Sequence, residues 1–297
     1  MKFQYTGGAA LLILSVAFSA CGDAEKATPS TPEAMYTRAQ ELIKPNVEGE
    51  SSDFAGAMQW LKRAAEAGFL PALLDLGGIY LEGGKGVQAD PSAAFDWFSR
   101  AAAQGSAEAE FYLGHIFYNG LGRPADKKSA AEHWRKASDG GVAEASYRLA
   151  HMLLAEQATR AEGLELLHKA AAADAPKLAA RAACDLGNIY AKGQVGVAVD
   201  MKKAAEWYAR SARGGDARAQ LVYAIMLLSG ESVPADAQQG MAMLRLSAGQ
   251  DNPQAIALLI NLLRNGEHAA DSEEEAAAWS ERLESLRRKK PENNSGE

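Results

Sequence analysis

The sequence predicts an all-α fold, an α-solenoid in which about seven helix-turn-helix units stack in single file. Two repeating patterns and the composition lead to this prediction. One pattern of small and large residues recurs every 36 or 37 residues, and a second places an aspartate seven residues before a large side chain. Alanine also outnumbers valine, isoleucine and threonine, which favours helices over strands.

Residues 1–20 are predicted to be a signal peptide. Lys2 precedes an apolar run from Ala9 to Ala20, which is too short to cross a hydrocarbon core of about 30 Å. Ser19-Ala20-Cys21 resembles the lipobox of bacterial lipoproteins, although Phe18 stands where that family usually has an aliphatic residue. The resemblance implies that Cys21 is lipidated and anchors the chain in a membrane. The alternative is an ordinary signal peptide that is cut nearby.

Residues 21–33 are expected to form a flexible tether, because they carry no large apolar side chain. In the lipoprotein family, an aspartate after the lipidated cysteine tends to retain the protein in the inner membrane. Gly22 occupies that position here. The resemblance therefore implies an exported protein of the bacterial envelope, in the outer membrane and facing the periplasm.

The first helix of each unit is predicted from a pattern that begins with alanine. Counting this alanine as offset 0, offsets 0, 4, 5 and 8 carry small, large, small and large residues, which share one helical face. The small residue at offset 5 allows a neighbouring helix to approach closely. The leading alanines, separated by 37, 36, 37, 37 and 36 residues, are Ala72, Ala109, Ala145, Ala182, Ala219 and Ala255.

The second helix of each unit is predicted to begin after an aspartate that caps its free N–H groups. The large residue seven positions later is expected on the buried side, and a glycine then ends the helix. The aspartates Asp53, Asp90, Asp126, Asp200 and Asp236 precede Trp60, Trp97, His133, Trp207 and Met243, and the glycines are Gly68, Gly105, Gly141 and Gly215.

The third unit and the two ends depart from the pattern. The third unit lacks the glycine-rich loop between helices, Leu167 takes the large position, and the connection 174–177 is expected to restore the spacing. Ala34–Lys44 and the helix around Trp279 are predicted to be capping units with polar outer faces. The solenoid is thus expected over residues 34–286, followed by a disordered polar tail over residues 287–297.

These residues resemble the Sel-one-like repeat family, which is related to the tetratricopeptide repeat. The best-matching unit carries Leu186-Gly187, Tyr190, Asp200 and Trp207, with Gly193, Gly196-Val197, Lys203-Ala204 and Gly214 at the remaining family positions. The resemblance implies a right-handed solenoid that acts as a scaffold for protein partners. Some exported relatives pair cysteines across each hairpin, but Cys184 is the only cysteine within the predicted solenoid.

Composition and motifs argue against several other functions. The net charge of −7 disfavours a nucleic-acid binder, which needs a broad basic surface. The sequence contains no nucleophile elbow, no Walker loop and no close histidine pair. We therefore expect no catalytic residue, no cofactor and no metal. Cys184 is interpreted as a small apolar residue, and a redox or disulfide role is the alternative.

The candidate binding surface is the face of the first helices that lies off the packing stripe, at offsets 2 and 6. In tetratricopeptide-like solenoids this face lines the concave groove, and aromatic and polar side chains there suit a peptide or helix partner. The alternative is that the aromatic residues pack within the stack. The predicted groove residues are Phe111, His115, Tyr147, His151, Asn188, Leu221 and Asn261.

The sequence thus predicts a non-catalytic, membrane-anchored scaffold that binds a protein or peptide partner through its groove. One alternative is a regulator or enzyme of cell-wall peptidoglycan metabolism in the envelope, against which the missing catalytic groups count. Another is a cytosolic scaffold whose apolar start is incidental.

Overall fold

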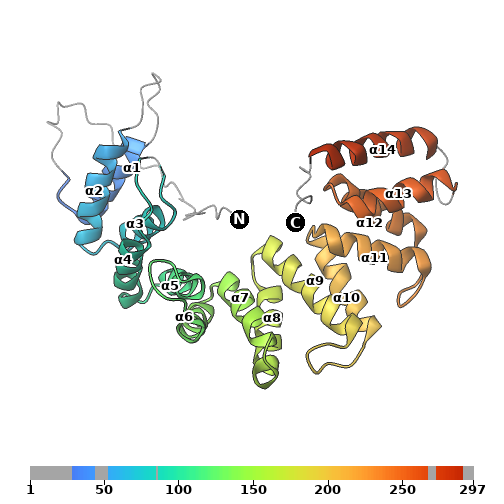
Figure 1. The fold of residues 1–297 in the computed structure, drawn as a ribbon, viewed down its shortest axis with the longest axis horizontal. Helices are drawn as coiled ribbons and strands as arrows, with labels where there is room; N and C mark the ends of the chain where they lie inside the picture. The colour runs from blue at the N-terminus through green and yellow to red at the C-terminus, as the bar shows by residue number, and fades with distance from the viewer. Residues whose placement is uncertain (1–28, 44–52, 85, 267–271, 290–297) are drawn as a thin grey trace, which may run out of the picture. The chain divides into compact units, whose positions relative to one another are not determined.

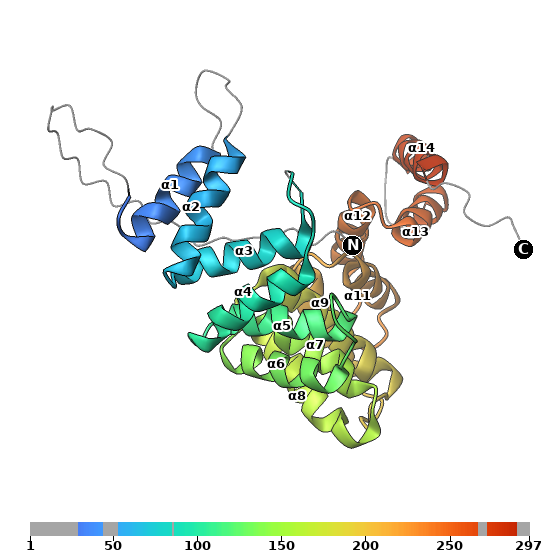
Figure 2. The same ribbon diagram turned by 60° about the vertical axis from the view of Figure 1, so that its left-hand side comes forward.

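The computed structural model describes residues 29–43, 53–84, 86–266 and 272–289. Within these residues the regular elements are helices, and strand pairing is limited to one isolated bridge between Gly84 and Val87. The α-helices pair in sequence order as antiparallel hairpins (Figures 1 and 2). The all-α prediction and the hairpin repeat are therefore confirmed.

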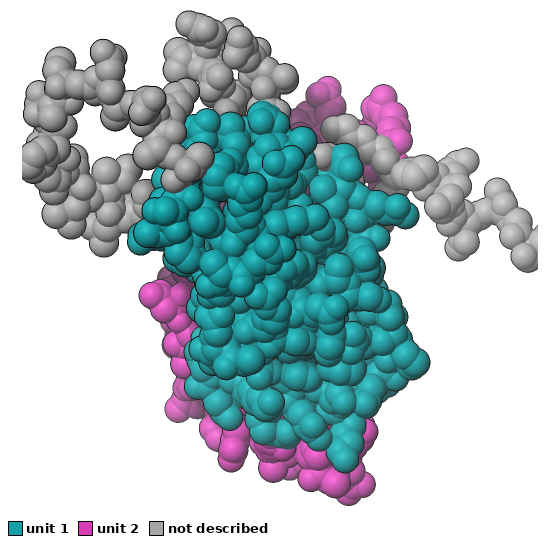
Figure 3. Space-filling model, turned by 90° about the vertical axis from the view of Figure 1, so that its left-hand side faces the viewer, with its two compact units in different colours: residues 1–142 teal, residues 143–297 magenta. Residues whose placement is uncertain are grey.

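The chain divides into two compact units, residues 1–142 and 143–297 (Figure 3). Unit 1 stacks three hairpins, in which each second helix packs against the first helix of the next hairpin. Its helices are α1 (Pro32–Ile43), α2 (Phe54–Glu66), α3 (Leu70–Glu82), α4 (Pro91–Ala103), α5 (Ala107–Asn119) and α6 (Lys127–Asp139).

Unit 2 stacks four hairpins in the same manner. Its helices are α7 (Ala143–Leu154), the short 3₁₀ helix η1 (Gln157–Thr159), α8 (Arg160–Ala172), α9 (Pro176–Lys192), α10 (Met201–Arg213), α11 (Ala217–Ser229), α12 (Ala237–Gly249), α13 (Pro253–Arg264) and α14 (Ser272–Lys289). Helix α14 extends three residues beyond the expected end of the solenoid at residue 286.

Aspartates cap the second helices as the sequence predicts. The side chain of Asp90 accepts hydrogen bonds from the backbone N–H groups of Ser92 and Ala93, at 3.1 and 3.0 Å, and the other four aspartates accept equivalent bonds. After α2, α4, α6 and α10, the four predicted glycines adopt φ angles between 85° and 90°, which only glycine adopts without strain.

In the five aspartate-capped second helices, the buried position lies one residue later than the sequence predicts. Trp97 and Trp207 are half-buried, whereas Phe98 and Tyr208 beside them are buried. A step of one residue turns the helix by about 100°, so two adjacent side chains face different directions. The position whose side chain faces the core is the eighth residue after the capping aspartate. It holds Leu61, Phe98, Trp134, Tyr208 and Leu244.

The small residue at offset 5 receives this buried side chain. A Cβ atom built on Gly77 would lie 2.5 Å from the Phe98 ring, and one on Gly114 would lie 2.4 Å from Trp134. Where offset 5 is alanine, as at Ala150 and Ala224, leucine takes the aromatic position, at Leu167 and Leu244. The two residues that meet between the helices of a hairpin thus have complementary sizes.

The third hairpin compensates for its missing loop differently from the prediction. The short helix η1 joins α7 directly to α8, and Leu167 is buried as expected. The connection at residues 174–177 is not a longer loop, because Pro176 and Lys177 already belong to α9. The 17-residue helix α9 therefore restores the spacing by adding a turn of helix.

Candidate functional site

We use the term first-helix face for the surface at offsets 2, 3 and 6 of the first helices α1, α3 and α5 in unit 1 and α7, α9, α11 and α13 in unit 2. The predicted groove residues fall on both units. Phe111 and His115 lie on α5 of unit 1. Tyr147, His151, Asn188, Leu221 and Asn261 lie on unit 2. Each unit therefore presents its own part of the predicted surface.

In unit 1 the two predicted residues have different environments. Phe111 is only 8% exposed, and its backbone carbonyl accepts a hydrogen bond from Trp134 Nε1 at 3.2 Å. It belongs to the core, as the alternative interpretation holds, and its ring is not offered to a partner. His115 is half-buried, and its Nδ1 lies 3.0 Å from Asn119 Nδ2, one turn along α5.

In unit 2, Tyr147 and His151 meet at a carboxylate that the sequence analysis missed. Tyr147 donates a hydrogen bond from its hydroxyl to Asp185 Oδ2 at 2.8 Å, and His151 Nε2 lies 3.0 Å from the same oxygen. The two rings contact edge to face, with their centroids 4.5 Å apart. Two consecutive hairpins are thereby joined on the first-helix face of unit 2.

A basic side chain of α9 completes this cluster. The guanidinium of Arg181 lies over the Tyr147 ring, 4.6 Å from its centroid. Burial alone would raise the pKa of Asp185, but hydrogen bonds from His151 and Tyr147 and the nearby charge of Arg218 on α11 hold this pKa below its ordinary value. Asp185 is thus an anion that several side chains stabilise. We call Tyr147, His151, Arg181 and Asp185 the Asp185 cluster.

The Tyr147 hydroxyl keeps its proton under ordinary conditions. Burial first, and then the hydrogen bond and negative charge of Asp185, raise the pKa of Tyr147 to about 12. The phenol is therefore a donor in the cluster, not a nucleophile. His151 is exposed, with 47% of its side chain accessible, so it presents an imidazole edge to solvent.

Asn188 and Cys184 both lie on α9 and contact neighbouring helices. Tyr208 donates its hydroxyl hydrogen to Asn188 Oδ1 at 2.9 Å. Cys184 is buried, and burial together with Asp216 raises its pKa to about 12. This supports the interpretation of Cys184 as a packed apolar residue, because a thiol with such a pKa is a poor nucleophile.

The two remaining predicted residues lie further along unit 2. Leu221 on α11 is half-buried and packs against the core of the last hairpins. Asn261 on α13 is exposed, and its Oδ1 lies 3.3 Å from Asn265 Nδ2. The structure records no hydrogen bond between either residue and the Asp185 cluster. Of the predicted groove residues, the cluster includes Tyr147 and His151.

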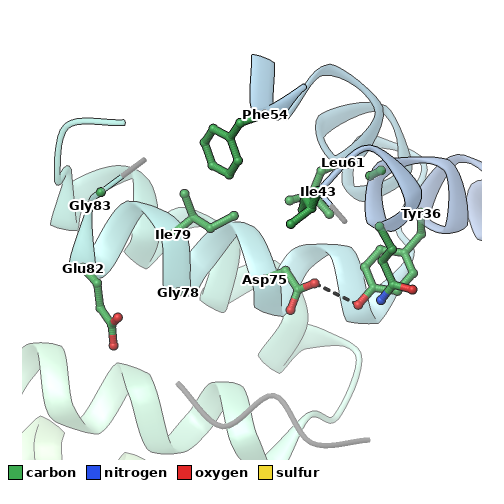
Figure 4. Close-up of a pocket in the computed structure, with 12 residues that line it drawn as sticks. Tyr36, Ile43, Phe54, Leu61, Asp75, Gly78, Ile79, Glu82 and Gly83 are labelled. Atoms are coloured by element: carbon green, nitrogen blue, oxygen red, sulfur yellow. Dashed lines mark hydrogen bonds between the residues drawn. The ribbon is translucent and has the colours of Figure 1, made fainter. Parts of the chain in front are cut away.

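Unit 1 contains the same bridge between successive first helices. Tyr36 on α1 donates its hydroxyl to Asp75 Oδ2 on α3 at 2.8 Å (Figure 4). Tyrosine at offset 2 followed by aspartate at offset 3 of the next unit occurs at both places, 39 and 38 residues apart. This recurring pair is the sequence signal that could have identified both carboxylates.

The described residues offer no group of three or more histidine, cysteine, aspartate or glutamate side chains that could hold a metal ion. Among the described helices, none combines the length and the apolar character needed to cross a bilayer. The predicted signal peptide and the lipidation site Cys21 lie outside the described residues.

Comparisons with known proteins agree with this architecture. A family model for the Sel1 repeat matches residues 48–69, 70–106, 107–142, 143–174, 180–216 and 217–252. No curated protein gives a significant match. Proteins with this repeat generally serve as protein-interaction modules.

Two solved structures resemble the chain over most of its length. A protective antigen of uropathogenic Escherichia coli strains with an SLR fold is 27% identical, with a TM-score of 0.74 over 86% of this chain and 54% of the antigen. The chain thus spans about half the length of that antigen. A Sel1 repeat protein from Oxalobacter formigenes is 21% identical, with a TM-score of 0.67 over 86% of this chain and 98% of the relative.

Proposed function

Since the chain belongs to the Sel1 repeat family, we propose that it is a non-catalytic scaffold of the bacterial envelope. It binds a protein or peptide partner through its first-helix faces, and a lipid on Cys21 holds it at the membrane. The outer membrane, with the repeats facing the periplasm, is the proposed location. The lipobox-like sequence that ends at Cys21 supports the anchor.

The Asp185 cluster is the observation that carries the binding proposal. It holds an exposed imidazole, an aromatic ring and a guanidinium in fixed positions through hydrogen bonds and ring contacts between α7 and α9. A preorganised surface loses less side-chain entropy when a partner binds. Aromatic and arginine side chains are also the types that dominate binding energy at interfaces.

Photo-crosslinking in the native envelope tests the binding proposal. A photoreactive amino acid replaces His151 in the full chain, and a matched control carries it at Lys202, an exposed residue of α10. We expect a specific crosslinked protein from position 151 alone.

Replacing Tyr147 and His151 together by alanine should remove this partner from pull-downs, whereas replacing Lys202 and Glu206 should not. An unchanged partner set would contradict the proposal.

Membrane fractionation tests the anchor separately. In cells, Cys21→Ser should move the protein from the membrane fraction to the soluble periplasmic fraction, because the thioether-linked lipid can no longer form. A variant that stays in the membrane fraction would refute the lipid anchor and leave the binding proposal standing.

A further inference from the structure

Unit 1 has an open pocket on its first-helix face, between the first hairpin and α3. Its volume is about 410 Å³, which lies in the range of ligand-binding pockets. The apolar wall is formed by Ile43 of α1, Phe54 and Leu61 of α2, and Ile79 of α3. Figure 4 shows Ile43, Phe54 and Ile79 directed toward the same space.

Carboxylates lie along one edge of this pocket. Asp75 and Glu82 both line it, and Figure 4 shows them on the same side of α3. The pocket residues that the structure describes include no lysine, arginine or histidine. Partial burial, and after it the charge of Asp75, raise the pKa of Glu108 on α5, so the charge of Asp75 acts on a neighbouring carboxyl as well.

Gly78 lines the pocket between these two carboxylates in the sequence of α3. It stands at offset 6 of its repeat, where the other repeats carry His115, His151, Asn188, Ile225 and Asn261. Gly78 is buried and has no side chain, so backbone forms the pocket wall at this position. Asp75, Gly78 and Glu82 follow one another along a single stripe of the helix.

We infer that this pocket binds an extended peptide segment of a partner protein in which one apolar side chain lies between two lysine or arginine residues, in the pattern basic-x-apolar-x-basic. In an extended peptide, residues i, i+2 and i+4 point to one side and span about 13 Å. Asp75 and Glu82 are seven residues apart on α3, a rise of about 10 Å. The flexible stems of two lysines absorb this difference.

In this arrangement each part of the peptide meets matching chemistry. The two cations pair with Asp75 and Glu82, and the central apolar side chain contacts Ile79, Ile43 and Phe54. The inference rests on the proposed scaffold function and adds to it the chemistry of one partner segment. It concerns unit 1 alone, so it does not depend on the Asp185 cluster of unit 2.

Fluorescence anisotropy with a defined probe tests the inference. The probe is a fluorescein-labelled peptide Gly-Lys-Ser-Phe-Ser-Lys-Gly, titrated with the full chain in detergent. One control peptide has glutamate in place of both lysines, and the other has alanine in place of phenylalanine. We expect both controls to bind at least about tenfold more weakly, equivalent to about 1.4 kcal/mol. Equal binding of the three peptides, or no binding of the probe, would overturn the inference.

Variants of the chain locate the binding. Gly78→Asn introduces the residue that stands at offset 6 in two other repeats, and it should weaken binding of the probe at least about tenfold by filling the pocket. Glu82→Gln changes an exposed side chain and should weaken binding and reduce its salt dependence. Because Glu82 is exposed, Glu82→Gln should leave the fold intact, and unaltered binding by this variant counts against the inference even if Gly78→Asn is unstable.

Methyl NMR distinguishes failure of the pocket inference from failure of the scaffold proposal. In the isoleucine-labelled chain, the probe should shift the methyl signals of Ile43 and Ile79 and leave those of the buried Ile189 and Ile256 in unit 2 unchanged. A partner that crosslinks at position 151 while Ile43 and Ile79 do not shift would overturn the pocket inference and leave the scaffold proposal intact.

Discussion

Single carboxylates on the first-helix face join one hairpin to the next. Asp75 and Asp185 each accept a hydrogen bond from a tyrosine of the preceding hairpin, with the same length of 2.8 Å. Both bonds are partly buried, so water competes with them less than at an open surface. These bridges link helices that otherwise present polar side chains to solvent, and they fix the positions of the side chains that a partner would meet.

Asp185 should make the stability of unit 2 sensitive to acid. Its pKa is lower in the folded chain than its ordinary value. The carboxylate therefore contributes stability above the ordinary aspartate pKa of about 3.9, and this contribution is lost as the pH falls through the lowered folded pKa. We expect Asp185→Asn to reduce the stability at pH 7 and to flatten its dependence on pH below about 4. Urea unfolding between pH 3 and 7 measures both effects. An unchanged slope would contradict the assignment.

Cys184 should be inert in the native protein. Its thiol is buried and its pKa is raised to about 12, so almost no thiolate forms at pH 8. We expect iodoacetamide to label Cys184 only when urea unfolds the chain, as peptide mass spectrometry would show. Rapid labelling of the folded protein would instead support the redox role that the sequence left open.

At the scale of the helix, the hairpins are held together by pairs of residues matched in size. Glycine faces an aromatic ring in three hairpins, at Gly77, Gly114 and Gly187, and alanine faces leucine in others. The Trp134 indole also donates a hydrogen bond to the backbone of α5. In these hairpins, the closest approach of the two helices therefore involves one residue from each helix.

Gly114→Ala should destabilise the protein because its Cβ would lie 2.4 Å from Trp134. We expect a loss of about 1–3 kcal/mol in the free energy of unfolding, as for other overpacked cores. Gly249→Ala at the end of α12 is the control, because its Cβ would meet nothing within 4 Å. It should change the stability by less than about 0.5 kcal/mol or raise it slightly.

Adding Trp134→Leu to Gly114→Ala should recover part of the loss, because it recreates the alanine–leucine pair of other hairpins. Chemical denaturation of the two single variants and the double variant measures the coupling. Additive effects of the two substitutions would show that the sizes of the two side chains are not matched.

The sequence predicted where the helices lie along the chain better than it predicted which of their residues face the core. The capping aspartates located five second helices, because a side chain that accepts backbone N–H bonds marks the start of a helix. The tryptophans at positions 97 and 207 suggested the wrong buried residue, since size alone does not reveal which of two adjacent large residues faces inward. The small residue at offset 5 was correctly interpreted as a site of close approach, but only the structure shows that it receives an aromatic ring.

At the scale of the whole molecule, each hairpin of a unit contacts mainly its neighbours in the sequence. A destabilising substitution in such an array should affect mainly its own hairpin and the adjacent ones, because stability is approximately a sum of hairpin and interface contributions. The predicted groove residues likewise form local groups. The sequence could identify offsets 2 and 6 as the surface, but the shared partner of Tyr147 and His151 is Asp185 at offset 3 of the next repeat, a position that the small-and-large pattern does not single out.

Hydrogen exchange should reveal this local response. Gly187→Ala places a Cβ 2.8 Å from Tyr208 and should reduce amide protection in α9 and α10, with smaller losses in α8 and α11. Gly114→Ala should instead reduce protection in α5 and α6. Uniform loss of protection through the whole chain in either variant would indicate a single cooperative transition rather than an array.

The matching of glycine to aromatic and of alanine to leucine has a consequence for how such chains change over evolutionary time. Both members of each pair lie in one hairpin, so a gene segment that encodes one hairpin carries its own complementary contact. Duplication or deletion of a whole repeat therefore preserves every such contact, whereas recombination within a repeat separates them. The length of the array is free to vary while the interior of each repeat stays constrained.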